Sequence, residues 1–255
     1  MKHRLAVVVA VLALVVIALG AYLTSDIRPL PGTTGPLGSD PALQQVHTIG
    51  GYIVAVLAIV LGVWALKPAG GFLPILALIL ALSSIWPLLH AIMSPIFFAA
   101  IVVVAVTTSP RWLAGPQRAP VSWPPVRILA LLTPLLVVMQ IGLGAAFRHN
   151  AMGVVSHIMN AFIVIAIVLI AGVFVVKQHP EHPDLKPAAL ALLITAGIQV
   201  LLGFAVYLVL LMAESNNIGL IITGVLHVTN GALTLAASVI FAMQVNRSLI
   251  KSSGA

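Results

Sequence analysis

The chain has 255 residues, of which 61% are apolar and only 7% are charged. A water-soluble domain of this size needs far more charge to cover its surface, so the composition excludes an ordinary soluble fold. The absence of cysteine excludes disulfides, thiolate metal sites and iron–sulfur clusters. The formal charge of +7 does not indicate nucleic-acid binding, because no basic cluster is interleaved with aromatic residues.

Long apolar runs recur along the sequence without the alternation that is typical of barrel strands. Backbone amides inside a bilayer must be paired within the chain, so these runs predict helices in contact with membrane lipid. The predicted spans are residues 5–23, 46–66, 72–86, 89–106, 126–147, 154–176, 187–212 and 219–245. We therefore expect an all-α integral membrane protein with eight transmembrane helices.

Two of the predicted spans allow another interpretation. Residues 5–23 follow a basic start and resemble a cleaved signal peptide, but the run is long and a small-x-small cleavage site is lacking. We expect a retained helix there. Residues 72–86 are close to the minimum length for crossing, and 71–107 could instead hold one kinked helix or a re-entrant pair.

The positions of Lys and Arg predict the orientation of the spans. With a cytoplasmic N-terminus and eight spans, only Arg28 and Arg148 fall on the outer side. The basic residues on the inner side are Lys2, Arg4, Lys67, Arg111, Arg118, Arg127, Lys177, Lys186, Arg247 and Lys251. This bias predicts a multi-pass protein of the cell inner (plasma) membrane with both termini in the cytoplasm.

A short motif recurs in several spans. The segments Gln140-Ile-Gly-Leu-Gly144 and Gln199-Val-Leu-Leu-Gly203 resemble each other, and Val16-Ile-Ala-Leu-Gly20 resembles the first. The repetition predicts two pseudo-symmetric four-helix bundles, residues 1–115 and 116–255, and duplicated halves often carry a site in each bundle.

Four of the eight histidines lie in or at the end of predicted spans, all toward the outer side. They are His47 and His90 in the first half and His157 and His227 in the second. A polar group in a span is costly and marks a functional site by default, although a single histidine can also bond a neighbouring carbonyl. Their recurrence at matching places favours a site. His179 and His182 lie in a Pro-rich inner loop, where we expect solvated side chains.

Two facing imidazoles suit the axial positions of haem iron, with the porphyrin filling the apolar space between helices. Zinc usually takes more ligands, and the predicted spans contain no Asp or Glu. A copper site with Met93, Met152 or Met159 remains open, although methionine is also ordinary apolar packing. Arg148 suits a haem propionate or a lipid headgroup. These residue types favour bis-histidine haem at His157 and His227 and at His47 and His90.

A family resemblance supports this interpretation. The stretch Gln140-Ile-Gly-Leu-Gly-Ala-Ala-Phe-Arg-His-Asn150, followed by His157, resembles the haem A synthase family of cytochrome oxidase assembly proteins, as do 199–204 and 226–233. Residues 19–24 and 90–98 match more loosely. The resemblance implies eight helices in two halves and a haem b held by His157 and His227. It also implies that His47 and His90 flank the site where the substrate haem O is oxidised to haem A, by conversion of a methyl group into a formyl group.

The first half departs from the family pattern. A glutamate three residues before the first histidine is usual in the family, but Gln44 stands there, and Thr48 replaces the usual arginine after His47. Glutamine cannot exchange a proton as a carboxylate does. The family's outer-loop cysteine pair is also missing. Asp26 and Asp40 are the remaining acidic candidates, so the sequence assigns no catalytic residue.

Three functions remain open at this stage. The first is a haem-binding relative of haem A synthase, acting in haem O to haem A conversion or in terminal oxidase assembly. The second is a non-catalytic haem b subunit that transfers electrons or docks onto a respiratory complex. The third is a small-molecule transporter, which the lack of central charged residues and the position of the histidines near one face disfavour.

Overall fold

The computed structural model describes residues 1–25, 41–65, 71–121, 125–212 and 218–251. Seven helices in these ranges are long and apolar enough to cross a membrane, as expected for a multi-pass membrane protein. They are α1 (Lys2–Ser25), α2 (Pro41–Trp64), α4 (Pro87–Thr107), α6 (Pro125–Arg148), α7 (Val154–Gln178), α8 (Leu185–Met212) and α9 (Ile218–Ser248). The prediction of an all-α membrane protein is confirmed at this level.

Helix α3 (Leu73–Ser83) is shorter than the span predicted at 72–86. Its 11 residues extend about 16 Å, roughly half the hydrocarbon core of a bilayer. The helix ends in a turn in which the Ser84 N–H bonds the Ala81 carbonyl. By helix length, the described part of the chain holds seven spans, and the predicted eighth is not confirmed.

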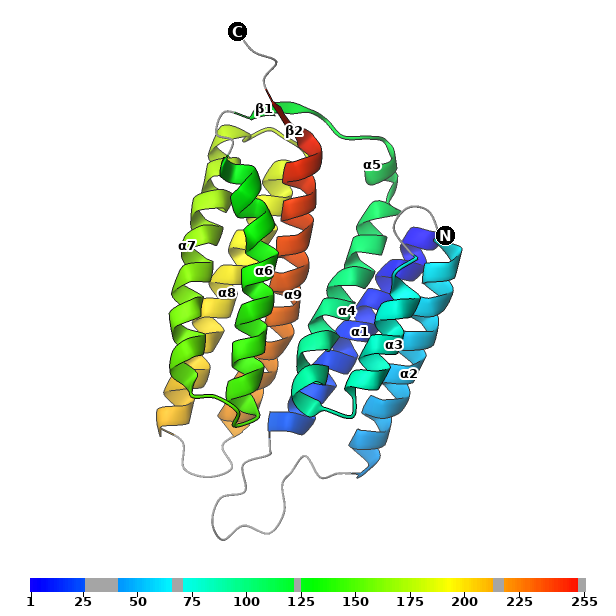
Figure 1. Ribbon diagram of the computed structural model, residues 1–255, viewed down its shortest axis with the longest axis vertical. Coiled ribbons are helices and arrows are strands. Elements are labelled where there is room, and N and C mark those ends of the chain that lie inside the picture. The colour runs from blue at the N-terminus through cyan, green and yellow to red at the C-terminus, as the bar shows by residue number, and fades with distance from the viewer. Residues whose placement is uncertain (26–40, 66–70, 122–124, 213–217, 252–255) are drawn as a thin grey trace.

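The helices form two groups that lie side by side. Helices α1–α4 lie on one side and α6–α9 on the other, and both termini are at the same end of the molecule (Figure 1). Helices α1, α4 and α6 all pack against α9, which joins the groups. The buried residues of α9 include Gly231, Ala232 and Ala236, and such small side chains let helices approach closely.

The outer surface of both groups is apolar. Large side chains such as Leu135, Phe162 and Leu201 are 66%, 65% and 70% exposed on the long helices. Water-soluble proteins rarely expose apolar surface of this extent, whereas lipid tails solvate it well. The exposure pattern therefore agrees with helices that face a bilayer.

Three features at the end with the termini were not predicted. The strands β1 (Ala119–Val121) and β2 (Leu249–Lys251) pair in parallel and tie the connection between the two helix groups to the C-terminal segment. A short helix, α5 (Pro110–Leu113), follows α4. His3, which precedes the span predicted at 5–23, lies in α1, and its Nδ1 is 2.8 Å from the Ala105 carbonyl of α4.

Candidate functional site

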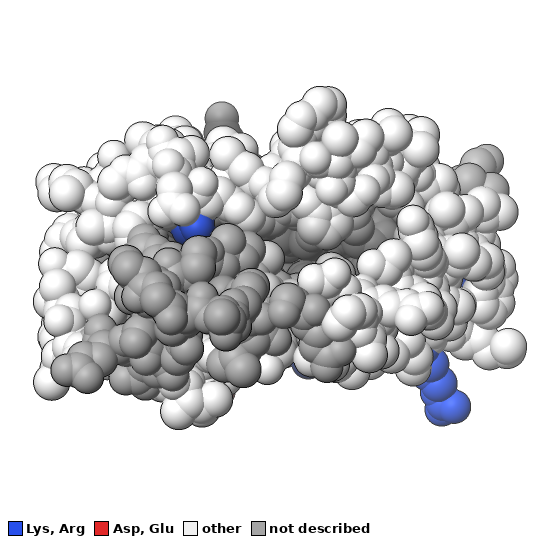
Figure 2. All heavy atoms as spheres, turned by 90° about the horizontal axis from the view of Figure 1, so that it is seen from below, with Lys and Arg blue, Asp and Glu red and all other residues white. Residues whose placement is uncertain are grey.

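The four span histidines lie toward the end of the molecule opposite the termini. Helices α2, α4, α7 and α9 all begin at that end (Figure 1). His47, His90 and His157 lie in the first two turns of α2, α4 and α7, and His227 lies in the third turn of α9. Figure 2 views this end and shows mostly uncharged atoms among the described residues.

The histidines form two pairs, one in each group of helices. The ring centroids of His157 and His227 are 6.1 Å apart, with an angle of 74° between the ring planes. The corresponding values for His47 and His90 are 6.3 Å and 84°. The structure therefore brings together the residues that were predicted to act together.

The spacing of each pair suits two axial ligands of one metal ion. An imidazole nitrogen binds a metal at about 2 Å, and its ring centre lies roughly 1 Å further away. Two imidazoles on opposite sides of one ion therefore have centroids about 6 Å apart. Both observed spacings agree with this value, so each pair would be able to hold a haem iron between its imidazoles.

In His157 and His47, a backbone carbonyl of the neighbouring helix holds Nδ1 of the ring. Nδ1 of His157 is 3.1 Å from the Gln140 carbonyl, and Nδ1 of His47 is 3.1 Å from the Val16 carbonyl. An Nδ1–H that donates to a carbonyl leaves the lone pair on Nε2 to bind a metal, as is usual for metal-bound histidine.

A glycine one helical turn after each of these carbonyls makes room for the ring. A Cβ atom added at Gly144 would lie 2.9 Å from Cε1 of His157, and one at Gly20 would lie 2.7 Å from Cε1 of His47. At Gly203 the distance to Cε1 of His227 would be 3.0 Å. The glycine of the recurring motif therefore provides the space in which an imidazole packs against the neighbouring helix.

The glutamine of the motif joins His157 to an asparagine. Nε2 of Gln140 lies 3.1 and 3.2 Å from the two ring nitrogens of His157 and donates to its carbonyl at 2.9 Å. Asn160, one turn after the histidine, donates to Oε1 of Gln140 at 2.7 Å. The amide pair therefore orients the imidazole, and the Gln140 amide must move away from Nε2 of His157 before that nitrogen can bind a metal.

The same arrangement occurs around His227. Nε2 of Gln199 is 3.2 Å from both ring nitrogens, and Asn230 donates to Oε1 of Gln199 at 2.8 Å. Asn160 and Asn230 were missed in the sequence. The available signal was the His-x-x-Asn spacing, which is present at 157–160 and again at 227–230.

The pair formed by His47 and His90 lacks these amides. A Cβ atom at Gly50, one turn after His47, would lie 3.1 Å from Val16, so an apolar contact replaces the glutamine–asparagine pair. Nδ1 of His90 is 3.3 Å from Oγ of the buried Ser83 on α3. Gln44 is exposed, and Thr48 bonds the Gln44 carbonyl within its own helix.

Arg148 links the two groups of helices near the histidines. It is the last residue of α6, and its Nη2 donates to the Ala21 carbonyl of α1 at 2.6 Å. Just beyond the span, partial burial and the Arg148 guanidinium lower the pKa of His149.

Acidic residues are scarce around both histidine pairs. Within the described ranges the acids are Glu181 and Asp184, in the loop at the opposite end. The other three acids, Asp26, Asp40 and Glu214, lie outside the described residues. The structure thus offers no described carboxylate for proton transfer at either pair.

The loop histidines His179 and His182 were expected to be solvated, but both are partly buried, and His182 holds the loop together. Nδ1 of His182 accepts from the backbone N–H groups of Asp184 and Leu185, and its Nε2 is 3.0 Å from the Gln117 carbonyl. Both ring nitrogens are engaged, so His182 offers no lone pair to a metal. Partial burial and the neighbouring His182 lower the pKa of His179.

The sequence matches no protein-family model and no curated protein. The assignment of function therefore depends on the two histidine pairs and on the groups that hold them.

Proposed function

We propose that the protein is a bis-histidine haem protein of the membrane, of the haem A synthase type, with a haem b between His157 and His227. The observation that carries this proposal is the pair geometry, a centroid distance of 6.1 Å between imidazoles on facing helices. A bound haem b supplies a one-electron iron couple.

The surrounding residues suit a tightly held haem. The Gln140 carbonyl and the Gln140–Asn160 pair orient His157, and the Gln199–Asn230 pair orients His227. Apolar helix faces exclude water from this site. The exclusion of water and the hydrogen bonds to the ligands together set the reduction potential of a bound haem. Arg148 ends the helix whose Gly144 faces His157, and its guanidinium suits a charge-assisted bond to a haem carboxylate.

We propose that His47 and His90 hold a second haem. In the catalytic version of the function this haem is the substrate haem O, haem A is the product, and the protein serves terminal oxidase assembly. The exposed Gln44 and the lack of a described carboxylate near this pair favour a second version. In that version the protein is a non-catalytic haem b subunit that transfers electrons within a respiratory complex.

A turnover assay separates the two versions. The purified protein is supplied with haem O, oxygen and a reductant, and the extracted haem is identified. Formation of haem A establishes the enzyme, whereas copurification with respiratory-complex subunits without turnover establishes the subunit.

We also propose the orientation in the plasma membrane. Of the described Lys and Arg, Arg148 alone lies at the histidine end, and the other nine lie at the end with the termini. The positive-inside rule then places both termini in the cytoplasm. On this topology α3 and its flanking turns form an eighth crossing, and residues 1–115 and 116–255 are two pseudo-symmetric halves.

Absorption spectra of the detergent-purified protein test the haem proposal. We expect a low-spin haem b spectrum in the oxidised and reduced states. The contribution of the haem between His157 and His227 should be lost in His157→Ala and in His227→Ala. The control His149→Ala lies at the same end and keeps the spectrum. A protein that carries no haem when expressed with ample haem supply contradicts the proposal.

A further inference from the structure

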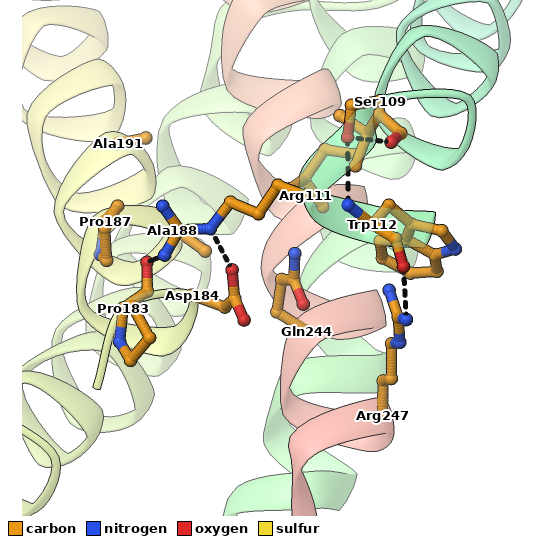
Figure 3. A pocket seen from close by; sticks show the side chains of 12 residues that line it. Ser109, Arg111, Trp112, Pro183, Asp184, Pro187, Ala188, Ala191, Gln244 and Arg247 are labelled. Carbon is orange, nitrogen blue, oxygen red and sulfur yellow. Dashed lines mark hydrogen bonds and ion pairs between the residues drawn. The ribbon is translucent and has the colours of Figure 1, made fainter. Parts of the chain in front are cut away.

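A cavity of about 350 Å³ lies between the two groups of helices at the end that carries the termini (Figure 3). One wall consists of the last turn of α4 together with the short helix α5. The other wall consists of the start of α8 and the last turns of α9. Val106, in this wall, is about 24 Å along α4 from His90. The cavity is therefore separate from the histidine sites.

Most of the cavity lining is apolar. Val106, Ala188, Ala191 and Ile240 contribute side chains from three helices. A purely ionic solute gains little from such a lining, whereas burial of a hydrocarbon chain is favourable by about 0.8 kcal/mol for each methylene group. The lining therefore suits an amphiphile.

Arg247 places a fixed positive charge at the cavity. Its guanidinium carbon lies 3.8 Å from the ring centroid of Trp112, and its Nη2 donates to the Trp112 carbonyl at 2.6 Å. Of the two acids in the described ranges, Asp184 pairs with Arg111, and neither lies within salt-bridge distance of Arg247. A guanidinium has five N–H donors, so Arg247 can bind an anion without losing its present bond.

Two further polar side chains line the same cavity. Gln244 lies between Arg247 and Asp184, and within the described residues its amide has no hydrogen-bond partner (Figure 3). Arg111 reaches from α5 to Asp184 and the Pro183 carbonyl, which closes one side of the cavity (Figure 3). The free donors of Gln244 and Arg247 thus lie beside an apolar floor.

We propose that this cavity binds an anionic phospholipid of the surrounding bilayer. The phosphate binds Arg247 and Gln244, and an acyl chain lies against Val106, Ala191 and Ile240. Arginine matches phosphate oxygens in a bidentate manner, and basic pockets between helices on the cytoplasmic side recognise anionic headgroups. Tryptophan beside the site fits the headgroup level of a membrane.

Native mass spectrometry of the full chain tests this binding. The protein is purified and supplied with phosphatidylglycerol or phosphatidylcholine at equal concentration. We expect phosphatidylglycerol to be retained about tenfold more strongly, and Arg247→Gln to remove about tenfold of that retention. The matched control Arg127→Gln lies at the same end but donates to the Asn246 carbonyl outside the cavity lining, and it leaves retention unchanged.

A second variant keeps the test decisive if Arg247→Gln fails to fold. Ala191→Leu fills the floor without changing charge, and it also lowers retention of phosphatidylglycerol. Equal retention of the two lipids, or equal effects of Arg247→Gln and Arg127→Gln, overturns the proposal. Displacement of the lipid by inorganic phosphate alone overturns it in favour of a site for free anions. Haem content is measured in parallel, so a failure here is distinguishable from a failure of the haem proposal.

Discussion

At the scale of single residues, three glycines determine whether an imidazole can reach the neighbouring helix. A Cβ atom added at Gly20, Gly144 or Gly203 would lie 2.7, 2.9 or 3.0 Å from Cε1 of a histidine, closer than an ordinary contact. The carbonyl of the neighbouring helix can hold Nδ1 only when the ring packs this closely. The glycine therefore allows the tautomer that has its proton on Nδ1 and its lone pair on Nε2.

We expect Gly144→Ala and Gly203→Ala to weaken haem binding between His157 and His227. Forcing a methyl group into a packed contact costs about 1–3 kcal/mol, which corresponds to a loss of affinity of about fivefold or more. Haem titration into the apoprotein measures this loss. Gly142→Ala and Gly197→Ala are matched controls, because an added Cβ meets only Ile92 at 3.8 Å or nothing within 4 Å. If all four variants bind haem equally, the role assigned to these glycines is wrong.

The asparagines give a second prediction at this scale. Asn160→Leu and Asn230→Leu remove the donor to a glutamine that touches the histidine ring. Loss of such a supporting hydrogen bond typically lowers metal affinity about 10–100-fold. The haem dissociation rate should rise accordingly. Asn246→Leu, whose side chain bonds only its own helix, should leave the rate unchanged.

At the scale of helices, α3 decides the topology. The chain leaves α2 at the end with the termini and enters α4 at the opposite end (Figure 1), yet α3 alone is too short to cross. Its exposed side chains include Ile75, Leu78 and Leu82, which suit contact with lipid. The crossing therefore requires the turns at both of its ends, or local thinning of the bilayer.

Cysteine labelling tests this crossing, because the chain has no cysteine of its own. In intact cells we expect Ser84→Cys to react with a membrane-impermeant maleimide. Gly71→Cys and the control Leu113→Cys should react only after the cells are opened. Labelling of both Gly71→Cys and Ser84→Cys from outside contradicts the crossing and supports a re-entrant α3.

Much of this helical framework could be predicted from the sequence. The predicted spans agree with the long helices to within about five residues, because apolar runs and charged ends dictate where lipid-facing helices begin and end. Helix α3 was predicted too long, because the turn at Ser84 depends on local backbone bonds. The strands β1 and β2 have three residues each, too few for a periodic pattern to appear.

The candidate site was only partly predictable. Its four histidines stood out because each interrupts an apolar run. Asn160 and Asn230 were missed, because a single amide in a helix has no distinctive pattern and only the repeated His-x-x-Asn spacing marks them. The bond from Arg148 to the Ala21 carbonyl could not be predicted, because a backbone acceptor carries no signature in the sequence.

At the scale of the whole molecule, Arg148 connects the two histidine pairs. It ends α6, whose Gly144 faces His157, and it bonds the carbonyl next to Gly20, which in turn contacts His47. One side chain thus bridges the helix groups at the end where both pairs lie. This connection suits a protein in which the two sites must keep a fixed relative position.

We expect Arg148→Gln to lower the midpoint potential of the haem at His157 and His227. A nearby positive charge favours the reduced iron, and loss of about 1 kcal/mol of this interaction corresponds to about 40 mV. A spectroelectrochemical titration measures the change. Arg127→Gln, at the opposite end, should leave the potential unchanged, and an equal shift in both variants contradicts the bridging role.

The most direct test of the central claim is the electron paramagnetic resonance spectrum of the oxidised, purified protein. The claim is that each histidine pair binds one haem iron with its imidazole planes crossed, at 74° and 84°. Crossed axial planes predict a highly anisotropic low-spin ferric signal that disappears only when both pairs are removed. A high-spin signal, a rhombic low-spin signal typical of parallel planes, or the absence of any ferric haem signal would contradict the claim.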